Sequence, residues 1–530
     1  MTLTRRQFSA ALVAGTASVA SAASAAKAAS PALANTPGST LVIAQASEPQ
    51  SLSNALSTEG NIYPISSKLF DGLLSFGADG KPIARLAQQW WQSADGLSLT
   101  LKLRPGVRWH DGKPFGAADV AYSVQEIWKT YNARGRSTFA TVQAVETPDP
   151  LTAVLRLSRP APYLLSALSS IESQVLPRHL YAGSDPLLNP HNAAPVGNGP
   201  FRFVRRQRGS QIVLERNPDY WNPAQPRIDK LVFRFVPDAA SVAAALETGE
   251  VQLGVPSLSD VARLQANPAL QVNEIDQPYT AALTALEFNL DRPVFRDLRV
   301  RQAFAHAIDR SFILKNIYHG HGSVADSPIP SAMREFYSRD VPTYPFDPVK
   351  SEALLDAAGL HRDAQGVRVT LKIDPTPAAE SIQLSQYIRS ALARVGVKLE
   401  VRNQDFAEFV NRIYTRRDFD TAVIGGNSGP DPAIGTQRWY WSKNFQPGVA
   451  FSNGTHYASA EMDRALESAQ TELDPIKRRQ QYLQFQRIAQ TDLPRIPLIA
   501  TTRVVVSSKR LRDFIDPAEG IYGNFGNAAI

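Results

Sequence analysis

The sequence predicts an α/β protein with more than one lobe, in which helices connect short parallel strands. The chain has 530 residues, which is too long for a single hydrophobic core. A strand, helix, strand order is visible twice, over 226–254 and over 367–425. With 43% hydrophobic and 20% charged residues, the composition is that of an ordinary globular protein, which argues against disorder and membrane spanning as descriptions of the whole chain.

The amino-terminal segment predicts an export signal. "RRQF" at 5–8 precedes a mildly apolar run, 9–26, that contains no charge and consists mainly of Ala, Ser and Val. This order is typical of an export signal, and "TRRQF" resembles the twin-arginine type. We therefore expect residues 1–34 to act as the signal. Three A-x-A patterns leave the cleavage point open, after Ala25, Ala28 or Ala34.

Charge and cysteine content restrict the function classes. Removal of the signal takes away three basic residues and no acids, so the formal net charge falls from +7 to +4. No basic run interleaved with aromatics follows, which argues against nucleic-acid binding. The chain has no Cys, and this excludes disulfides, thiolate metal sites and a cysteine-linked lipid anchor. We expect a mature chain that is free in an extracytoplasmic space.

The first elements after the signal indicate a mixed unit. Residues 40–45 form a short apolar strand, and a turn-rich loop follows at 46–52. Alternating residues predict a half-buried strand within 97–109, and apolar residues at helical spacing predict a helix over 120–131. Residues 66–195 therefore read as an α+β unit with frequent Pro and Gly.

The stretch 226–254 predicts a βαβ unit. An apolar strand at 231–236 precedes Asp238, a suitable N-cap for the Ala-rich helix that follows. Gly249 ends that helix, and 251–253 form the second strand. This order implies parallel pairing.

The second stretch repeats the same logic at greater length. A strand at 367–374 leads into a helix that Gly396 ends, and the next strand occupies 397–402. A capping-box pattern at 405–408 starts another helix, and 420–425 form the third strand. The order β-α-β-α-β predicts one half of a doubly wound parallel sheet.

The loop after the third strand is a candidate ligand site, because ligands of open parallel sheets bind where loops leave the carboxyl ends of strands. Gly425 and Gly426 would allow a close approach of the backbone, and Asn427 and Ser428 offer uncharged donors and acceptors. The alternative is that this Gly-rich segment forms only a tight turn.

The aromatic run that follows extends the candidate site. Trp439 and Tyr440 combine a broad apolar face with a polar tip, and Arg438 could pair with a ligand carboxylate. The alternative is that part of this run packs into the core.

No catalytic signature is present. The sequence has no nucleophile elbow, zinc-protease motif or phosphate loop. His319 and His321 are two apart, a spacing that can chelate a metal, yet no third ligand is visible. We expect an exposed loop there, and metal binding by the pair stays an open alternative. The sequence predicts no cofactor.

Five segments, in this order, carry a family resemblance. They are "LFDGLLSFGADGKPIARLAQQWWQSADGLSLTLKLRPGVRWHDGKPFGAADVAYSVQEIW", "PVGNGPFRF", "IVLERNPDYW", "FRDLRVRQAFAHAIDRSFI" and "YPFDPVKSEALLDAAG". From about residue 40 to the carboxyl terminus, the chain resembles the family 5 solute-binding proteins of ABC importers, a group with dipeptide-, oligopeptide- and nickel-binding members.

The resemblance implies a two-lobed, hinged receptor in the periplasm. Such a receptor is a monomer, not an enzyme, and it closes on a small solute and delivers it to the transmembrane subunits of a permease. The implied boundaries are 38–65, 196–285 and 505–530 for lobe I, 66–195 for an extra subdomain of that lobe, and 286–504 for lobe II.

The resemblance also implies where the solute lies. Family ligands touch the loop after the first strand, here Ala46 and Ser47, and the loop after the strand at 420–425. Peptide-binding members carry an acid in the second loop that pairs with the peptide amino group, and this chain has Ser428 at that position. The Asp431 that follows is expected to form a turn.

The missing acid favours a solute with a blocked or absent amine. A neutral hydroxyl cannot replace an ion pair in a desolvated cleft. Peptide-like solutes remain the leading hypothesis, and opine-like conjugates, sugars, metal or haem are alternatives for the same fold. A cofactor enzyme exported by the twin-arginine route is the alternative of another class.

Overall fold

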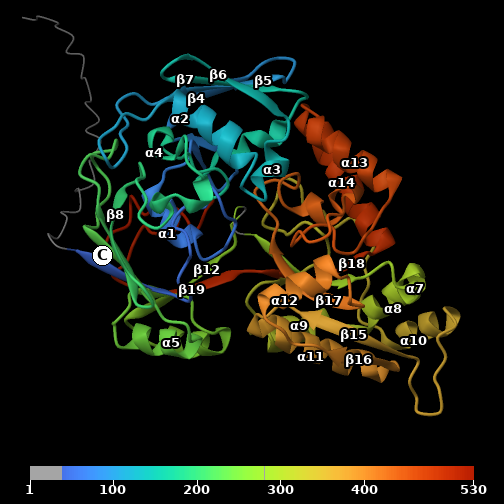
Figure 1. Ribbon diagram of the computed structural model, residues 1–530. Coiled ribbons are helices and arrows are strands. Elements are labelled where there is room, and N and C mark those ends of the chain that lie inside the picture. The colour runs from blue at the N-terminus through green and yellow to red at the C-terminus, as the bar shows by residue number, and fades with distance from the viewer. Residues whose placement is uncertain (1–38, 278, 280) are drawn as a thin grey trace, which may run out of the picture. The chain divides into compact units, whose positions relative to one another are not determined.

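The computed structural model describes residues 39–277, 279 and 281–530 (Figure 1). The predicted export signal lies outside these residues. The described part contains sheets of seven, six, four and two strands, with helices between them. The predicted α/β class is therefore confirmed.

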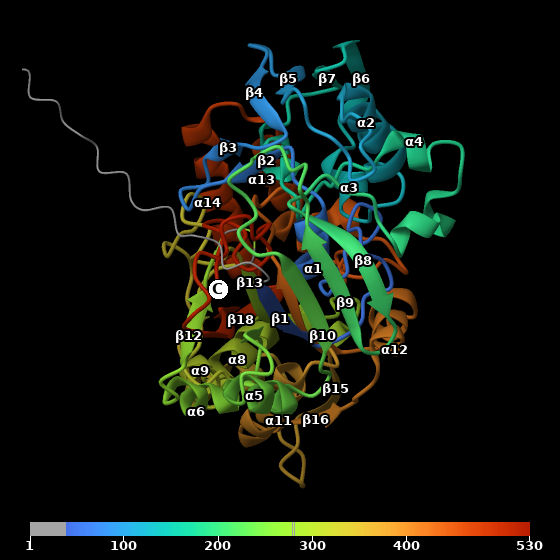
Figure 2. The same cartoon turned by 90° about the vertical axis from the view of Figure 1, so that its left-hand side faces the viewer.

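The seven-stranded sheet joins segments from both ends of the described chain. In spatial order its strands are β12 (Leu270–Ile275), β19 (Arg503–Ser508), β11 (Leu253–Gly254), β1 (Thr40–Gln45), β10 (Lys230–Phe235), β9 (Gln211–Arg216) and β8 (Phe201–Gln207). β1 lies between β10 and β11 and is parallel to both. Figure 2 shows β8, β9 and β10 side by side.

The predicted βαβ unit is confirmed within this sheet. Helix α5 (Ala239–Glu247) connects β10 to β11 and packs against β11 and β19. The Asp238 side chain accepts a hydrogen bond from the backbone N–H of Ser241 at 2.7 Å, as expected of an N-cap. Gly249 has φ of 75°, the left-handed conformation that ends helices.

The six-stranded sheet contains the second predicted unit. Its strands, in spatial order, are β14 (Ser323–Val324), β18 (Arg495–Thr501), β13 (Ala282–Phe288), β17 (Thr421–Asn427), β15 (Val369–Pro375) and β16 (Val397–Val401). β15 is parallel to β16 and to β17. Helix α11 (Ala379–Arg394) connects β15 to β16, and α12 (Phe406–Val410) precedes β17. The β-α-β-α-β order is confirmed.

The other half of this sheet differs from a doubly wound parallel sheet. β13 is antiparallel to both β17 and β18. These strands come from distant parts of the chain. The sheet is mixed because an antiparallel neighbour satisfies the free backbone edge of β17 without a crossover connection.

A smaller antiparallel sheet forms the upper part of Figure 1. Its strands are β4 (Ala87–Gln92), β5 (Ser98–Leu103), β7 (Thr152–Leu157) and β6 (Val142–Asp149), and β2 (Leu74–Phe76) pairs with β3 (Pro82–Ala84). Helix α2 (Ala117–Tyr122) packs on β6 and β7. The strand predicted within 97–109 is confirmed as β5.

The remaining helices cover the sheets or pack on one another. They are α1 (Tyr63–Leu69), α3 (Gly135–Thr138), α4 (Arg178–Tyr181), α6 (Val261–Gln265), α7 (Pro293–Arg296), α8 (Leu298–Ala307), α9 (Arg310–Asn316), α10 (Pro348–Ala357), α13 (Ala460–Thr471) and α14 (Pro475–Asp492). α13 and α14 lie side by side (Figure 1). Within the described part of the chain, no helix is long and apolar enough to span a bilayer.

Candidate functional site

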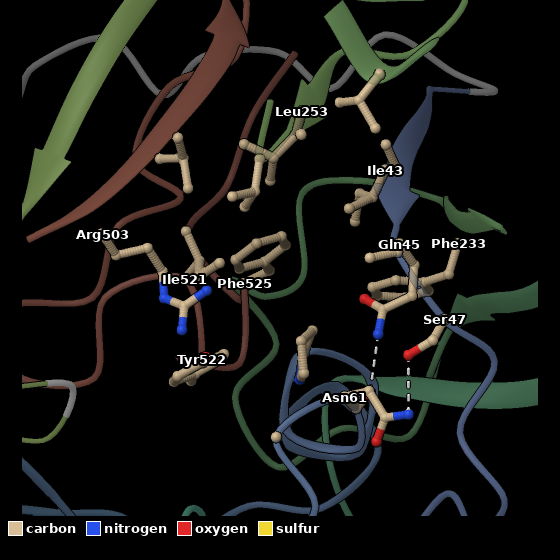
Figure 3. Close-up of a pocket in the computed structure, with 18 residues that line it drawn as sticks. Ile43, Gln45, Ser47, Asn61, Phe233, Leu253, Arg503, Ile521, Tyr522 and Phe525 are labelled. Atoms are coloured by element: carbon tan, nitrogen blue, oxygen red, sulfur yellow. Dashed lines mark hydrogen bonds between the residues drawn. The ribbon is translucent and has the colours of Figure 1, made fainter. Parts of the chain in front are cut away.

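A cavity of about 300 Å³ lies at the carboxyl ends of β1, β10 and β11 (Figure 3). Ala46 and Ser47, both predicted to bind ligand, line its rim. The Asn61 side chain donates a hydrogen bond to Ser47 Oγ at 3.1 Å, and Gln45 Nε2 donates to the Asn61 carbonyl at 2.9 Å. These bonds fix the first predicted loop against the residues that precede α1.

The wall of this cavity is mainly apolar. The apolar lining residues labelled in Figure 3 are Ile43, Phe233, Leu253, Ile521, Tyr522 and Phe525. Arg503 adds a charged edge, with its guanidinium 5.2 Å from the centre of the Tyr522 ring. A concave apolar surface with few polar groups is suited to holding an apolar part of a small molecule.

A buried lysine supports this wall from behind. Lys68 Nζ donates to the carbonyls of Ile521 and Gly523, at 2.8 and 2.5 Å, and lies 4.0 Å from the centre of the Phe525 ring. Burial lowers the pKa of Lys68 to about 7. Burial also raises the pKa of Glu519, in the same carboxyl-terminal segment, to about 8. Lys68 and Glu519 thus both lie behind the cavity, and burial disfavours the charged form of each.

We expect Glu519→Gln to change how stability depends on pH. Between the ordinary carboxyl pKa of 4.5 and the folded value of about 8, the folded protein keeps a proton on Glu519 that the unfolded chain has lost. The free energy of unfolding of the wild type therefore falls as pH rises, by at most about 1.4 kcal/mol per pH unit from this group. Urea denaturation at pH 5, 6 and 7 measures the free energy of unfolding of both proteins. The value for Glu519→Gln should rise relative to that of the wild type as the pH increases. The exposed Glu59→Gln is the control, and a constant difference between E519Q and wild type would contradict the prediction.

The two glycines at the end of β17 differ in what surrounds them. A Cβ on Gly426 would lie 2.6 Å from Cζ2 of Trp439, whereas a Cβ on Gly425 would lie 3.5 Å from Thr284 Oγ1, an ordinary contact. The packing of Trp439 is therefore enough to explain why residue 426 is a glycine. Contact with a ligand is not needed for this explanation. Contact of either glycine with a ligand stays a prediction.

Gly426→Ala is expected to destabilise the protein by about 1–3 kcal/mol, because the added methyl group displaces the buried Trp439 ring. Gly425→Ala is the matched control in the same strand and should change stability little. Thermal unfolding of both variants measures the difference. Equal midpoints for the two variants would show that the Trp439 contact does not constrain this strand.

Asn427 and Ser428 make their visible contacts within the protein. Asn427 Nδ2 donates to the Tyr279 carbonyl at 3.1 Å, and Asn427 Oδ1 accepts from the Gly429 N–H at 2.7 Å. Ser428 is fully buried; its N–H donates to the Ala281 carbonyl at 2.9 Å, and its Oγ has no partner among the described residues. Residues 425–427 belong to strand β17, and the bond between Asn427 and Gly429 lies at the end of this strand. Ligand binding by Asn427 or Ser428 stays a prediction.

Asp431 is the one acid in the loop at 428–435, and its carboxylate is occupied. It accepts two hydrogen bonds from the guanidinium of Arg478, at 2.7 and 2.8 Å, in a buried ion pair. It also accepts from the N–H of Ala433 at 2.9 Å, so the predicted turn-forming role is confirmed. The loop therefore presents no free carboxylate.

Trp439 and Tyr440 are core residues in this structure, each 1% exposed. They pack in a hydrophobic cluster that includes side chains of α13 and α14. The Arg495 guanidinium lies 4.4 Å from the centre of the Trp439 ring and forms a buried ion pair with Glu287 at 2.7 Å. Trp439 and Tyr440 therefore pack into the core, which was one of the two roles that the sequence left open. Stacking of either ring on a ligand stays a prediction.

Arg438, the remaining predicted residue, lines a second cavity of about 420 Å³. Its Nη2 donates to the Asn427 carbonyl at 3.3 Å, and its guanidinium lies 4.8 Å from the centre of the Trp439 ring. The structure therefore divides the predicted residues between two cavities and the core, with Ala46 and Ser47 at the first cavity and Arg438 at the second.

Of the two histidines considered for metal binding, His321 meets one carboxylate and His319 lies in solvent-exposed surroundings. His321 Nδ1 lies 3.0 Å from Glu274 Oε1, and His319 is exposed at a positive φ of 52°. Across 39–277, 279 and 281–530, no group of three His, Cys, Asp or Glu side chains is arranged to hold a metal ion.

Comparison with known proteins decides the family. The model of bacterial extracellular solute-binding proteins, family 5, matches residues 81–448, more than half of the chain. A protein of Brucella ovis, named as a candidate ABC transporter peptide-binding protein, is 31% identical over 465 residues, which covers 83% of each chain. The chain belongs to this family.

Solved structures agree with the two-lobed fold expected of a family 5 protein. NikZ from Campylobacter jejuni, in complex with Ni(L-His), has a TM-score of 0.81 at 26% identity, covering 92% of this chain and 98% of NikZ. AgaA from A. tumefaciens R10, in complex with agropinic acid, has a TM-score of 0.79 at 25% identity, covering 93% and 98%. The family 5 resemblance and the role as the substrate-binding component of an ABC importer are confirmed.

Three features of this family 5 protein were not found from its sequence. They are the ion pair of Asp431 with Arg478, the pairing of Glu287 with Arg495, and the approach of residues 133–137 to Arg438. No local pattern marks any of them. Each joins residues that are far apart in the chain.

Proposed function

We propose that this family 5 protein is a periplasmic receptor that captures a peptide-like solute between two lobes and delivers it to the transmembrane subunits of an ABC permease. It acts as a monomer by binding and release, without a cofactor and without chemistry on the solute. The Brucella ovis relative is named for peptide binding, and the AgaA structure holds agropinic acid. Both support a small organic solute.

The main evidence for the type of solute is that the loop after β17 has no free carboxylate among its described residues. Ser428 stands where an anchoring acid is expected, and Asp431 is bound by Arg478. A protonated amine in a desolvated cleft needs a carboxylate partner. We therefore infer that the solute has a blocked or absent amine, as in a modified peptide.

We propose that the solute contacts both predicted loops and the residues that follow them. The candidate contacts are Ala46, Ser47, Gly425, Gly426, Asn427, Ser428, Arg438, Trp439 and Tyr440. Ser428, Trp439 and Tyr440 are buried in this structure, and Trp439 and Tyr440 pack against side chains of the same proposed lobe. Contact of a ligand with these three residues therefore requires a local rearrangement of their packing in addition to opening of the cleft.

The sheets support a division into two lobes, but the boundary expected at 285 falls inside β13 and the one expected at 504 falls inside β19. The chain passes from the seven-stranded sheet to the six-stranded sheet between Ile275 and Ala282, and returns through Thr502 between β18 and β19. Position 285 is inside β13, so we place the hinge on these two connections rather than on 285 itself. Two short connections between rigid sheets are the arrangement that hinge motion needs.

Titration calorimetry with matched peptides tests this function. We expect N-acetylated dipeptides to bind and the same dipeptides with a free amine to bind at least about tenfold more weakly, since the free ammonium lacks a partner. Saturating acetylated peptide should also reduce the radius of gyration in small-angle scattering. Equal affinity for both peptide sets would overturn the solute assignment. A stoichiometric chromophore or metal in the purified protein would instead favour the cofactor alternative.

A further inference from the structure

The second cavity is an arginine-lined pocket, defined here by Thr58 and by two segments that lie about 300 positions apart in the chain. Residues 133–137 form one side, and residues 434–452 form the other. Three guanidinium groups, of Arg134, Arg136 and Arg438, belong to its lining. Among the described residues that line it there is no Asp or Glu. A cavity with this composition carries a positive potential.

The charge of Arg134 is already neutralised. Its guanidinium forms an ion pair with Glu172, and the two side chains are 9% and 4% exposed. Glu172 is thereby bound to Arg134, and it attracts Arg438 only through space, without an ion pair. Arg136, in contrast, is exposed, and its charge adds to the potential at the entrance.

Arg438 has no such partner. Within the described part of the chain, no carboxylate forms an ion pair with it, and its buried Nε makes no hydrogen bond. Its polar contact is the 3.3 Å bond to the Asn427 carbonyl, and the rings of Trp439 and Phe451 flank it at 4.8 and 5.8 Å. By comparison, the buried Arg478 and Arg495 each have a carboxylate at 2.7 Å.

An unpaired cation in this position is costly. Burial, followed by repulsion from Arg134, lowers the pKa of Arg438 to about 9. Arg438 is half-buried as a whole residue, and a desolvated charge is normally paired because desolvation without a partner is unfavourable. Binding of an anion from outside would supply the missing partner and recover that energy.

We propose that the arginine-lined pocket binds the anionic group of the transported solute, a carboxylate or a phosphate, with Arg438 as its ion-pair partner. This rests on the proposed function, because the anion is taken to be part of the captured solute. A guanidinium can bind either oxyanion through two parallel hydrogen bonds. The wall formed by Val449, Ala450 and Phe451 limits water around the pair, and Arg136 attracts the anion toward the entrance.

The first test uses simple anions, so it does not depend on the identity of the solute. Thermal unfolding is followed in sodium acetate, sodium phosphate and sodium chloride at equal ionic strength. We expect acetate, phosphate or both to raise the midpoint of the wild type above its value in chloride, and the effective anion identifies the group. Arg438→Gln should abolish this rise, and Arg205→Gln, which removes an exposed arginine on β8, should keep it.

The same variants separate a binding role from a structural one. Because Arg438 is unpaired, Arg438→Gln should unfold in chloride at the wild-type temperature or above it. A lower midpoint in chloride, together with an anion response like that of the wild type, would show that Arg438 is structural and would overturn the proposal. No response of the wild type to acetate or phosphate would overturn it as well.

A second test links the pocket to the solute. N-acetylated dipeptides with a free carboxylate should bind Arg438→Gln about tenfold or more weakly than wild type, and the corresponding peptide amides should bind both proteins alike. Equal affinity of wild type and variant for the acids would overturn the proposal while the receptor function stands. An anion response without any peptide binding would refute the peptide assignment and leave the anion pocket in place.

Discussion

Asp431→Asn is expected to lower the free energy of unfolding by about 3–5 kcal/mol, because it leaves the buried guanidinium of Arg478 without a charged partner. The native carboxylate accepts one hydrogen bond from each terminal nitrogen of that guanidinium, at 2.7 and 2.8 Å. An amide of the same size can accept one of these bonds, but it cannot neutralise the charge. Urea denaturation at neutral pH measures the loss, and the transition slope checks that the unfolded state is unchanged.

Two further variants make this result specific. Asp340→Asn removes the acid of an exposed ion pair with Arg487 and should cost at most about 1 kcal/mol. The double variant Asp431→Asn with Arg478→Gln removes both charges, and it should recover much of the loss of the single variant. If D431N alone lowers the free energy of unfolding by less than about 1 kcal/mol, the charge of Arg478 does not need the Asp431 carboxylate as its partner.

Gly435→Ala is expected to lower the free energy of unfolding by about 3 kcal/mol or more, at the upper end of overpacking effects. A Cβ on residue 435 would lie 1.9 Å from the carbonyl oxygen of Ser428 and 2.2 Å from its carbon. Both atoms belong to the backbone, so the whole turn at 428–435 must move. The turn carries Asp431 and leads to Arg438, and its displacement should therefore also weaken binding of N-acetylated dipeptides.

Gly60→Ala is the matched control for this substitution. A Cβ on Gly60 meets no atom within 4 Å, so its stability should stay near that of the wild type. Both variants are compared by urea denaturation, and calorimetry with the acetylated peptides compares Gly435→Ala with the wild type. Wild-type stability of Gly435→Ala would contradict the tight packing of this turn.

The sequence determined most of the local structure. The units at 226–254 and 367–425 were predicted from hydrophobic periodicity and from caps such as Asp238 and Asp405. Both caps are present, with the Asp405 side chain accepting from the N–H of Glu408 at 2.8 Å. These predictions succeed because a strand, a helix and a cap depend on residues that are at most a few positions apart.

The candidate site was predicted in outline only. The sequence placed it at the loops after β1 and β17, and the family resemblance gave the reason to join them. It could not distinguish the two glycines of β17, because the contact that separates them involves Trp439, thirteen positions after Gly426. Nor could it show that Trp439 and Tyr440 are buried, since a Trp-Tyr pair suits a core and a binding surface equally well.

Tertiary structure alone decided which charges are paired. Asp431 and Arg478 are 47 positions apart, and Glu287 and Arg495 meet because β13 pairs with β18. Arg438 looks like any other arginine in the sequence, and it becomes distinctive only when residues 133–137 bring two more guanidinium groups and no free acid to its side. The sequence fixes how many charges there are. Their pairing depends on distance and burial, which arise only when segments distant in the chain are packed together.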